Sequence, residues 1–140
     1  MTAEGAALAA IVVLLFPMGY FLLASPAFLL VRLDVPQVAQ LLRGMFSIHF
    51  AAVSVAGVIG TVAFAIAGHP LLAIGVGVIT TLAFGGRGWF LRRWDAQLDA
   101  DRARDAEAVR QLRKLHWGGM VSNAIQLAAV VACIPYVAST

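Results

Sequence analysis

The chain has 140 residues, of which 61% are hydrophobic and 12% are charged, and its mean hydropathy is +0.90. Soluble domains carry about 25% charged residues, so this composition excludes a water-soluble globule. The net charge of +3 comes from basic residues that cluster beside apolar runs. That distribution is typical of the cytoplasmic loops of membrane proteins and argues against a nucleic-acid-binding protein.

Three stretches contain no Asp, Glu, Lys or Arg: residues 5–31, 44–86 and 115–140. A membrane-spanning helix needs about 20 apolar residues. The first and last stretches each hold one span, and the middle one holds two, with a break at Gly68-His69-Pro70. We therefore predict an all-α integral membrane four-helix bundle, a single domain over residues 1–140. Its expected spans are about 6–31, 44–67, 71–91 and 115–135.

The first span contains Pro17, which is expected to kink the helix, and Pro26 near its end. Glu4 and the lack of Lys or Arg before the apolar run differ from the basic start of a signal peptide. The span is therefore expected to remain in the protein. The single cysteine, Cys133, excludes an internal disulfide, and we interpret it as a small apolar residue.

The second span is preceded by an amphipathic stretch, Pro36–Arg43, which is expected to lie at the membrane surface. Pro36 suits the first turn of a helix, where its missing N–H costs nothing. The buried part is expected over residues 44–67. Small residues spaced three and four apart predict a helix-packing face that also includes His49. This face consists of Ala52, Ala56 and Gly60.

The third span is expected to begin at Leu71, and Trp89 and Trp94 fit an aromatic belt at the membrane surface. Residues 92–114 then alternate acidic and basic side chains three or four positions apart, as in a solvated helix. We expect helices 3 and 4 to extend into the cytoplasm as a charged hairpin that turns near residues 101–105.

The last span carries a polar stripe formed by His116, Asn123 and Gln126. At about 100° per residue, Asn123 falls almost over His116, and Gln126 follows within a quarter turn. Such a stripe is expected to face protein, either as hydrogen bonds between helices or as a polar ligand site. The helix is expected to cross as far as Ala132 and to be ended by Pro135.

All ten Lys and Arg residues lie at Arg32, at Arg43 or within residues 87–114. The positive-inside rule then places both termini outside and these loops in the cytoplasm. His49 and His116 are consequently expected at similar depth. Two such histidines suit axial ligation of haem, binding of another metal, proton transfer, or hydrogen bonding within the packed bundle.

The spans lack the ionisable groups that ion-coupled carriers keep in the membrane, and the chain has no zinc-protease, serine-hydrolase or nucleotide-binding motif. We therefore predict a non-enzymatic accessory or structural subunit that contacts the lipid bilayer and either further copies of itself or other membrane subunits. The alternative is a membrane redox protein that binds haem b through His49 and His116. Beyond that alternative, the sequence assigns no cofactor.

Three segments resemble a family of small four-helix membrane proteins of unknown function, the transmembrane protein 205-like family, which has many bacterial members. They are Ser25-Pro-Ala-Phe-Leu-Leu30, Gln40-Leu-Leu-Arg-Gly-Met-Phe-Ser-Ile-His49-Phe, and Leu112-Arg-Lys-Leu-His116-Trp-Gly-Gly-Met-Val-Ser-Asn123-Ala-Ile-Gln126. The resemblance implies a membrane-embedded four-helix bundle and no established activity. We expect the protein to be a multi-pass protein of a bacterial inner membrane. A fainter likeness to small haem- or copper-handling four-helix membrane proteins supplies the haem alternative. Those proteins place a histidine early in helix 1, where this chain has none.

Overall fold

The computed structural model describes residues 2–101 and 106–138. Within these ranges the chain is helical and contains no strand, so the predicted all-α class is confirmed. Four helices are long and apolar enough to cross a membrane. The elements are α1 (Ala3–Ala24), the short 3-10 helix η1 (Ser25–Leu29), α2 (Pro36–Ile66), α3 (Pro70–Asp101) and α4 (Ala106–Ala138).

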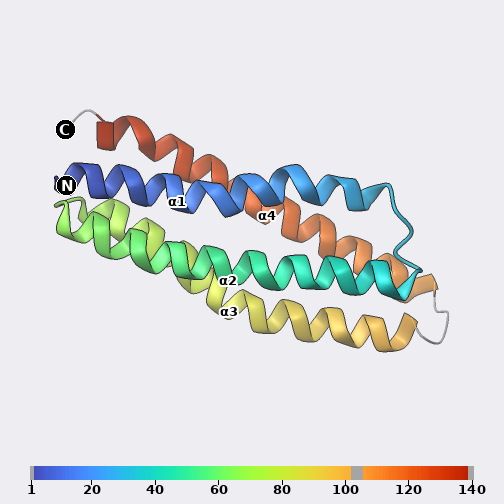
Figure 1. Ribbon diagram of the computed structural model, residues 1–140. Helices are drawn as coiled ribbons and strands as arrows, with labels where there is room; N and C mark the ends of the chain where they lie inside the picture. Colours follow the sequence, from blue (N-terminus) through green and yellow to red (C-terminus); the bar gives the residue numbers. More distant parts are fainter. Residues whose placement is uncertain (1, 102–105, 139–140) are drawn as a thin grey trace.

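The four helices run side by side in alternating directions (Figure 1). One end of the bundle holds the start of α1, the end of α4 and the turn between α2 and α3, and we call it the termini end. The other end holds the connection from η1 to α2, the last turns of α3 and the first turns of α4, and we call it the loop end. Each helix packs on the next in sequence, and α1 also packs on α4, which closes a ring of four.

Three of the helices are much longer than the apolar layer of a membrane. They contain 31, 32 and 33 residues for α2, α3 and α4. At about 1.5 Å per residue these helices are roughly 46–50 Å long, whereas the hydrocarbon core is about 30 Å thick. The surplus length lies at the loop end, where the charges are. The expected surface stretch Pro36–Arg43 is therefore the start of α2 itself, and its Ala39 and Leu42 are buried.

Two prolines act differently from the expectation. The first helix was expected to continue to Val31, but α1 ends at Ala24 and gives way to η1. Pro26 has no N–H to bond the Leu22 carbonyl, so the chain tightens into a 3-10 turn. The prediction that Pro135 ends the last helix was wrong, because α4 continues through it to Ala138. The buried Val137 holds this final turn against the core.

Continuation of α4 through Pro135 is favoured because a membrane interior offers the backbone no partner outside the helix.

The turn of the charged hairpin was expected near residues 101–105. Residues 102–105 lie outside the described part of the chain. On either side of them, α3 runs without a break to Asp101, and α4 begins at Ala106.

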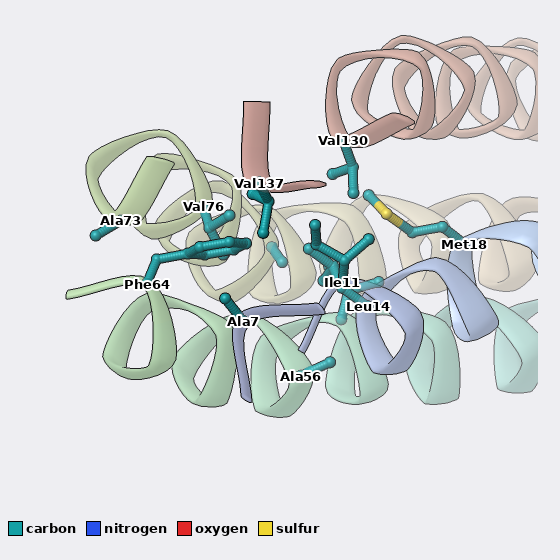
Figure 2. Close-up of a cluster of buried hydrophobic side chains, with 12 residues drawn as sticks. Ala7, Ile11, Leu14, Met18, Ala56, Phe64, Ala73, Val76, Val130 and Val137 are labelled. Atoms are coloured by element: carbon teal, nitrogen blue, oxygen red, sulfur yellow. The ribbon is translucent and has the colours of Figure 1, made fainter. Parts of the chain in front are cut away.

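The buried side chains form two clusters. In the termini half, Ile11 and Leu14 of α1 belong to one cluster with Phe64 of α2 and Val137 of α4 (Figure 2). In the loop half the cluster is aromatic and is built around Phe21, Phe46, Phe90 and Trp94. The polar side chains that follow lie in or beside this aromatic half.

Candidate functional site

Two of the three residues of the polar stripe are buried in the bundle. His116 is 0% exposed and Asn123 is 3% exposed. Gln126 is half-buried, and its amide nitrogen donates to the Ser122 hydroxyl on the same helix, 3.1 Å away. The quarter turn between Gln126 and the other two explains the difference, because it rotates Gln126 from α1 toward the seam between α3 and α4.

Asn123 joins α4 to α1. Its amide nitrogen donates to the carbonyl oxygen of Met18 at 3.0 Å. Pro17 precedes this residue inside α1 and deprives the Val13 carbonyl of its helical donor. The amide therefore bonds a carbonyl beside the proline, not the carbonyl that the proline leaves free.

His116 joins α4 to η1. Its Nε2 lies 2.7 Å from the hydroxyl oxygen of Ser25, and both side chains are fully buried. One turn earlier on α4, Arg113 donates to the Leu29 carbonyl at 3.1 Å. The last helix thus holds η1 at its first and last residues. Sequence reasoning did not single out Ser25 as a site residue, although a Ser-Pro pair at the end of a helix is a signal that the backbone changes there.

The contact between Ser25 and His116 has the residue types of a nucleophile and its base. It lacks the other requirements. Nδ1 of His116 has no hydrogen-bond partner among the described residues, so no third group orients the ring. The hollows described below are not lined by either residue. The bond holds η1 against α4.

His49 lies on α2, half-buried, with its ring stacked on Phe21. The ring centroids are 4.2 Å apart and the planes are inclined by 27°. α1 therefore presents an aromatic ring to this histidine.

Two phenylalanine rings occupy the space between the two histidines. From His49 the stack passes to Phe21, then to Phe46 with centroids 4.9 Å apart, and then to His116 with centroids 5.9 Å apart. Axial ligation needs both imidazoles to face one macrocycle, and these rings fill the place it would take. Nor do the residues with described positions contain any group of three or more His, Cys, Asp or Glu suited to a metal ion. The residues present do not fit a haem.

Any side chain at position 119 would collide with one of these rings, that of Phe46. A Cβ atom placed there would lie 2.8 Å from Cζ of Phe46, which is closer than real carbon contacts allow. The glycine therefore lets Phe46 of α2 lie against the backbone of α4. The neighbouring Gly118 has open space around the same position.

The residues of the predicted packing face of α2 differ in how deeply they are buried. Ala56 and Gly60 are buried and Ala52 is half-buried. α2 and α3 approach closely at Gly57, where a Cβ atom would collide with the Thr80 hydroxyl. Sequence reasoning missed Gly57, although its spacing of three from Gly60 is itself a small-residue pattern.

The loop end carries two further links between α2 and α3 that the sequence did not predict. Arg43 and Asp95 form a bidentate ion pair, in which Nη2 donates to Oδ2 at 2.7 Å. Trp94 donates from its indole nitrogen to the Ala39 carbonyl at 3.2 Å. The expectation that Trp94 belongs to a surface belt was wrong, since it is 0% exposed, whereas Trp89 is 53% exposed.

The seam between α3 and α4 is hollowed at three places. A small cavity of about 30 Å³ lies behind it and is lined in part by His49, Ser122, Asn123 and Gln126. A groove of about 590 Å³ opens toward the loop end, and a hollow of about 340 Å³ opens toward the termini end. We call the last two the loop-end groove and the apolar hollow.

The small cavity is bordered by side chains whose buried polar atoms lack partners. Nδ1 of His49 and the Asn123 amide oxygen form no hydrogen bond to a described residue. A cavity of this size has room for water, and buried polar groups of this kind are usually satisfied by it. The arrangement suits a hydrated, structural polar cluster.

In comparisons with known proteins, no family model, no curated protein and no solved structure matches the chain.

Proposed function

We propose that the protein is a non-enzymatic accessory or structural subunit of a membrane assembly, with both termini outside a bacterial inner membrane. The observation that carries this proposal is the apolar hollow between α3 and α4. Its lining includes Gly75 and Val76 of α3 with Ala129, Val130 and Cys133 of α4. Small side chains allow another helix to approach closely, so the hollow suits a large apolar side chain from a partner's membrane-spanning helix.

The polar side chains support a structural role because they link the protein's own helices. Ser25 pairs with His116, Asn123 with Met18, and Trp94 with Ala39. Each of these bonds lies in the buried part of the bundle. What the protein offers to its surroundings is an apolar surface with hollows in one seam.

A partner of a different sequence suits the seam better than a second copy of this chain. Two parallel copies meeting along the seam would bring Arg93 and Lys114 of one copy toward the same residues of the other. Like charges at short distance disfavour such a pairing. The partner helix is therefore expected to come from another protein.

Photo-crosslinking from Cys133 tests this proposal, since the only cysteine lies in the hollow. A benzophenone maleimide attached there in native membranes should give an adduct with one defined membrane protein. The matched control is Val55→Cys in a Cys133→Ala background, which places the label on an exposed position of α2. Adducts with lipid alone from both positions would refute the proposal, and an adduct of twice the chain mass would replace the foreign partner by a second copy.

The orientation has its own test. Thr2→Cys and Asp34→Cys, each in the Cys133→Ala background, place one thiol at the termini end and one at the loop end. A membrane-impermeant maleimide added to whole cells, after the outer membrane is opened, should label Thr2→Cys only. Labelling of Asp34→Cys alone would reverse the proposed orientation.

A further inference from the structure

The loop-end groove differs from the apolar hollow in having a charged mouth. Its walls are α3 from Leu82 to Arg93 and α4 from Gln111 to Gln126. Gly86 and Gly118 keep it wide, because a Cβ atom at Gly118 would meet nothing within 4 Å, and one at Gly86 would meet only Phe50, at 4.0 Å. The middle of the groove is apolar, and its deep end carries the hydrogen-bonded pair Ser122 and Gln126.

Two cations line the mouth, one from each helix. Arg93 lies over the ring of Trp89, with Cζ 5.4 Å from the ring centroid, and Lys114 of α4 borders the same groove. Neither forms an ion pair with a residue of described position, and no carboxylate lines the groove. The mouth therefore has positive charge to offer to an anion.

The length of the groove matches one leaflet of a bilayer. The distance along α3 from Leu82 to Arg93, or along α4 from Lys114 to Gln126, is about 16–18 Å. Half of the hydrocarbon core is about 15 Å thick. Its volume of about 590 Å³ also lies in the range of small-molecule sites. A partner's membrane-spanning helix would not end at mid-membrane.

We infer that the loop-end groove binds one anionic phospholipid, with its phosphate between Arg93 and Lys114 and an acyl chain along Gly86 and Gly118. The cations select for negative charge, because each basic residue near a membrane surface favours anionic lipid. The acyl chain of the lipid fills the space beside Gly86 and Gly118 that no side chain of the protein occupies. Trp89 lies at the level where aromatic residues meet headgroups. This site is separate from the apolar hollow and does not depend on the accessory role.

Brominated lipids give a direct test, because bromine on an acyl chain quenches nearby tryptophan. The experiment uses the Trp117→Phe variant, in which Trp89 in the groove wall and the buried Trp94 remain as fluorophores. It is reconstituted in phosphatidylcholine vesicles with increasing fractions of brominated phosphatidylglycerol or brominated phosphatidylcholine. We expect the binding affinity obtained from the quenching curves to be roughly tenfold higher for phosphatidylglycerol than for phosphatidylcholine, because two cations act together on the anionic headgroup.

Two pairs of variants separate the site from general surface charge. Arg93→Gln with Lys114→Gln should remove the preference. Arg92→Gln with Arg110→Gln removes the same charge from the same helices outside the groove lining and should leave it. Gly86→Leu with Gly118→Leu should reduce quenching by both lipids, whereas Gly88→Leu, an exposed position of α3 outside the lining, should not. Helix content measured by circular dichroism shows that each variant has folded.

Several results would overturn the inference. One is equal quenching by the two lipids in the parent protein, which is also what a partner helix or a second copy seated in the groove would give. Another is equal loss of preference in both charge pairs, which would indicate surface charge alone. Loss of the preference in the presence of millimolar inorganic phosphate would show that the mouth of the groove binds a free anion and would overturn the proposal that it binds a lipid.

Discussion

The hydroxyl of Ser25 and Nε2 of His116 share a buried hydrogen bond of 2.7 Å across 91 residues of sequence. The bond fixes the start of η1 to the last helix. Because both side chains are fully buried, neither has water as a substitute partner. A group left alone in such a place costs more than the bond itself contributes.

Ser25→Ala should destabilise the bundle by about 1–2 kcal/mol, because it removes the hydroxyl partner of Nε2 from a fully buried place. The measurement is the free energy of unfolding in mixed micelles. Thr81→Ala is the control, since Thr81 is exposed and bonds only the Gly77 carbonyl of its own helix. In a double-mutant cycle with His116→Phe, the two losses should not add. Additive losses would mean that the bond contributes nothing.

Asn123→Leu should destabilise by about 1 kcal/mol, as measured for hydrogen bonds between membrane helices. It keeps a similar volume and removes the bond to Met18. Asn123→Asp should be worse, because it removes the donor and buries a charge or forces protonation. Gln126→Leu is the matched control and should be neutral within about 0.5 kcal/mol, as for a position without a buried partner. Equal effects at the two positions would contradict the assignment.

Adjacent glycines give a paired test of packing. Gly119→Ala should destabilise by about 1–3 kcal/mol, because the new methyl group meets the ring of Phe46. Gly118→Ala has open space and should stabilise α4 by up to about 1 kcal/mol through helix propensity. Thermal unfolding in detergent measures both. Phe46→Leu should partly rescue Gly119→Ala, and failure of that rescue would place the collision elsewhere.

The absorption spectrum tests the haem alternative. We expect the purified protein to show no Soret band, and added haem to produce no low-spin spectrum, because Phe21 and Phe46 fill the space between the two histidines. Free haem and a His49→Ala variant serve as references. A low-spin spectrum lost in His49→Ala and in His116→Ala would overturn this prediction and restore the redox function.

The sequence predicts the helices well, because the membrane makes the problem nearly one-dimensional. A charge-free run of sufficient length has one stable structure there. The ends of the helices were predicted less accurately. Pro135 looked like a terminator, as it is in water, but it costs one hydrogen bond and the packing of Val137 outweighs that loss.

Contacts between helices were harder to predict, since they depend on how each helix is rotated about its axis. The burial of Asn123 agrees with the expected inward stripe, whereas Gln126 lies a quarter turn away at the seam. Trp94 was interpreted from its distance along the chain, which contains no information on which side it faces. Ser25 lacks any periodic pattern that would have distinguished it from its neighbours, whereas Gly57 shares its spacing pattern with the other small residues of α2, and spacing alone does not say which of them touches α3.

The hold of α4 on η1 also bears on the order of assembly. The first helix is synthesised long before the last, because translation proceeds from the amino terminus. His116 and Asn123 therefore enter the membrane when Ser25 and the Met18 carbonyl are already there to receive them. The last helix to arrive thus completes the structure, because its buried His116 and Asn123 bind the segment that arrived first.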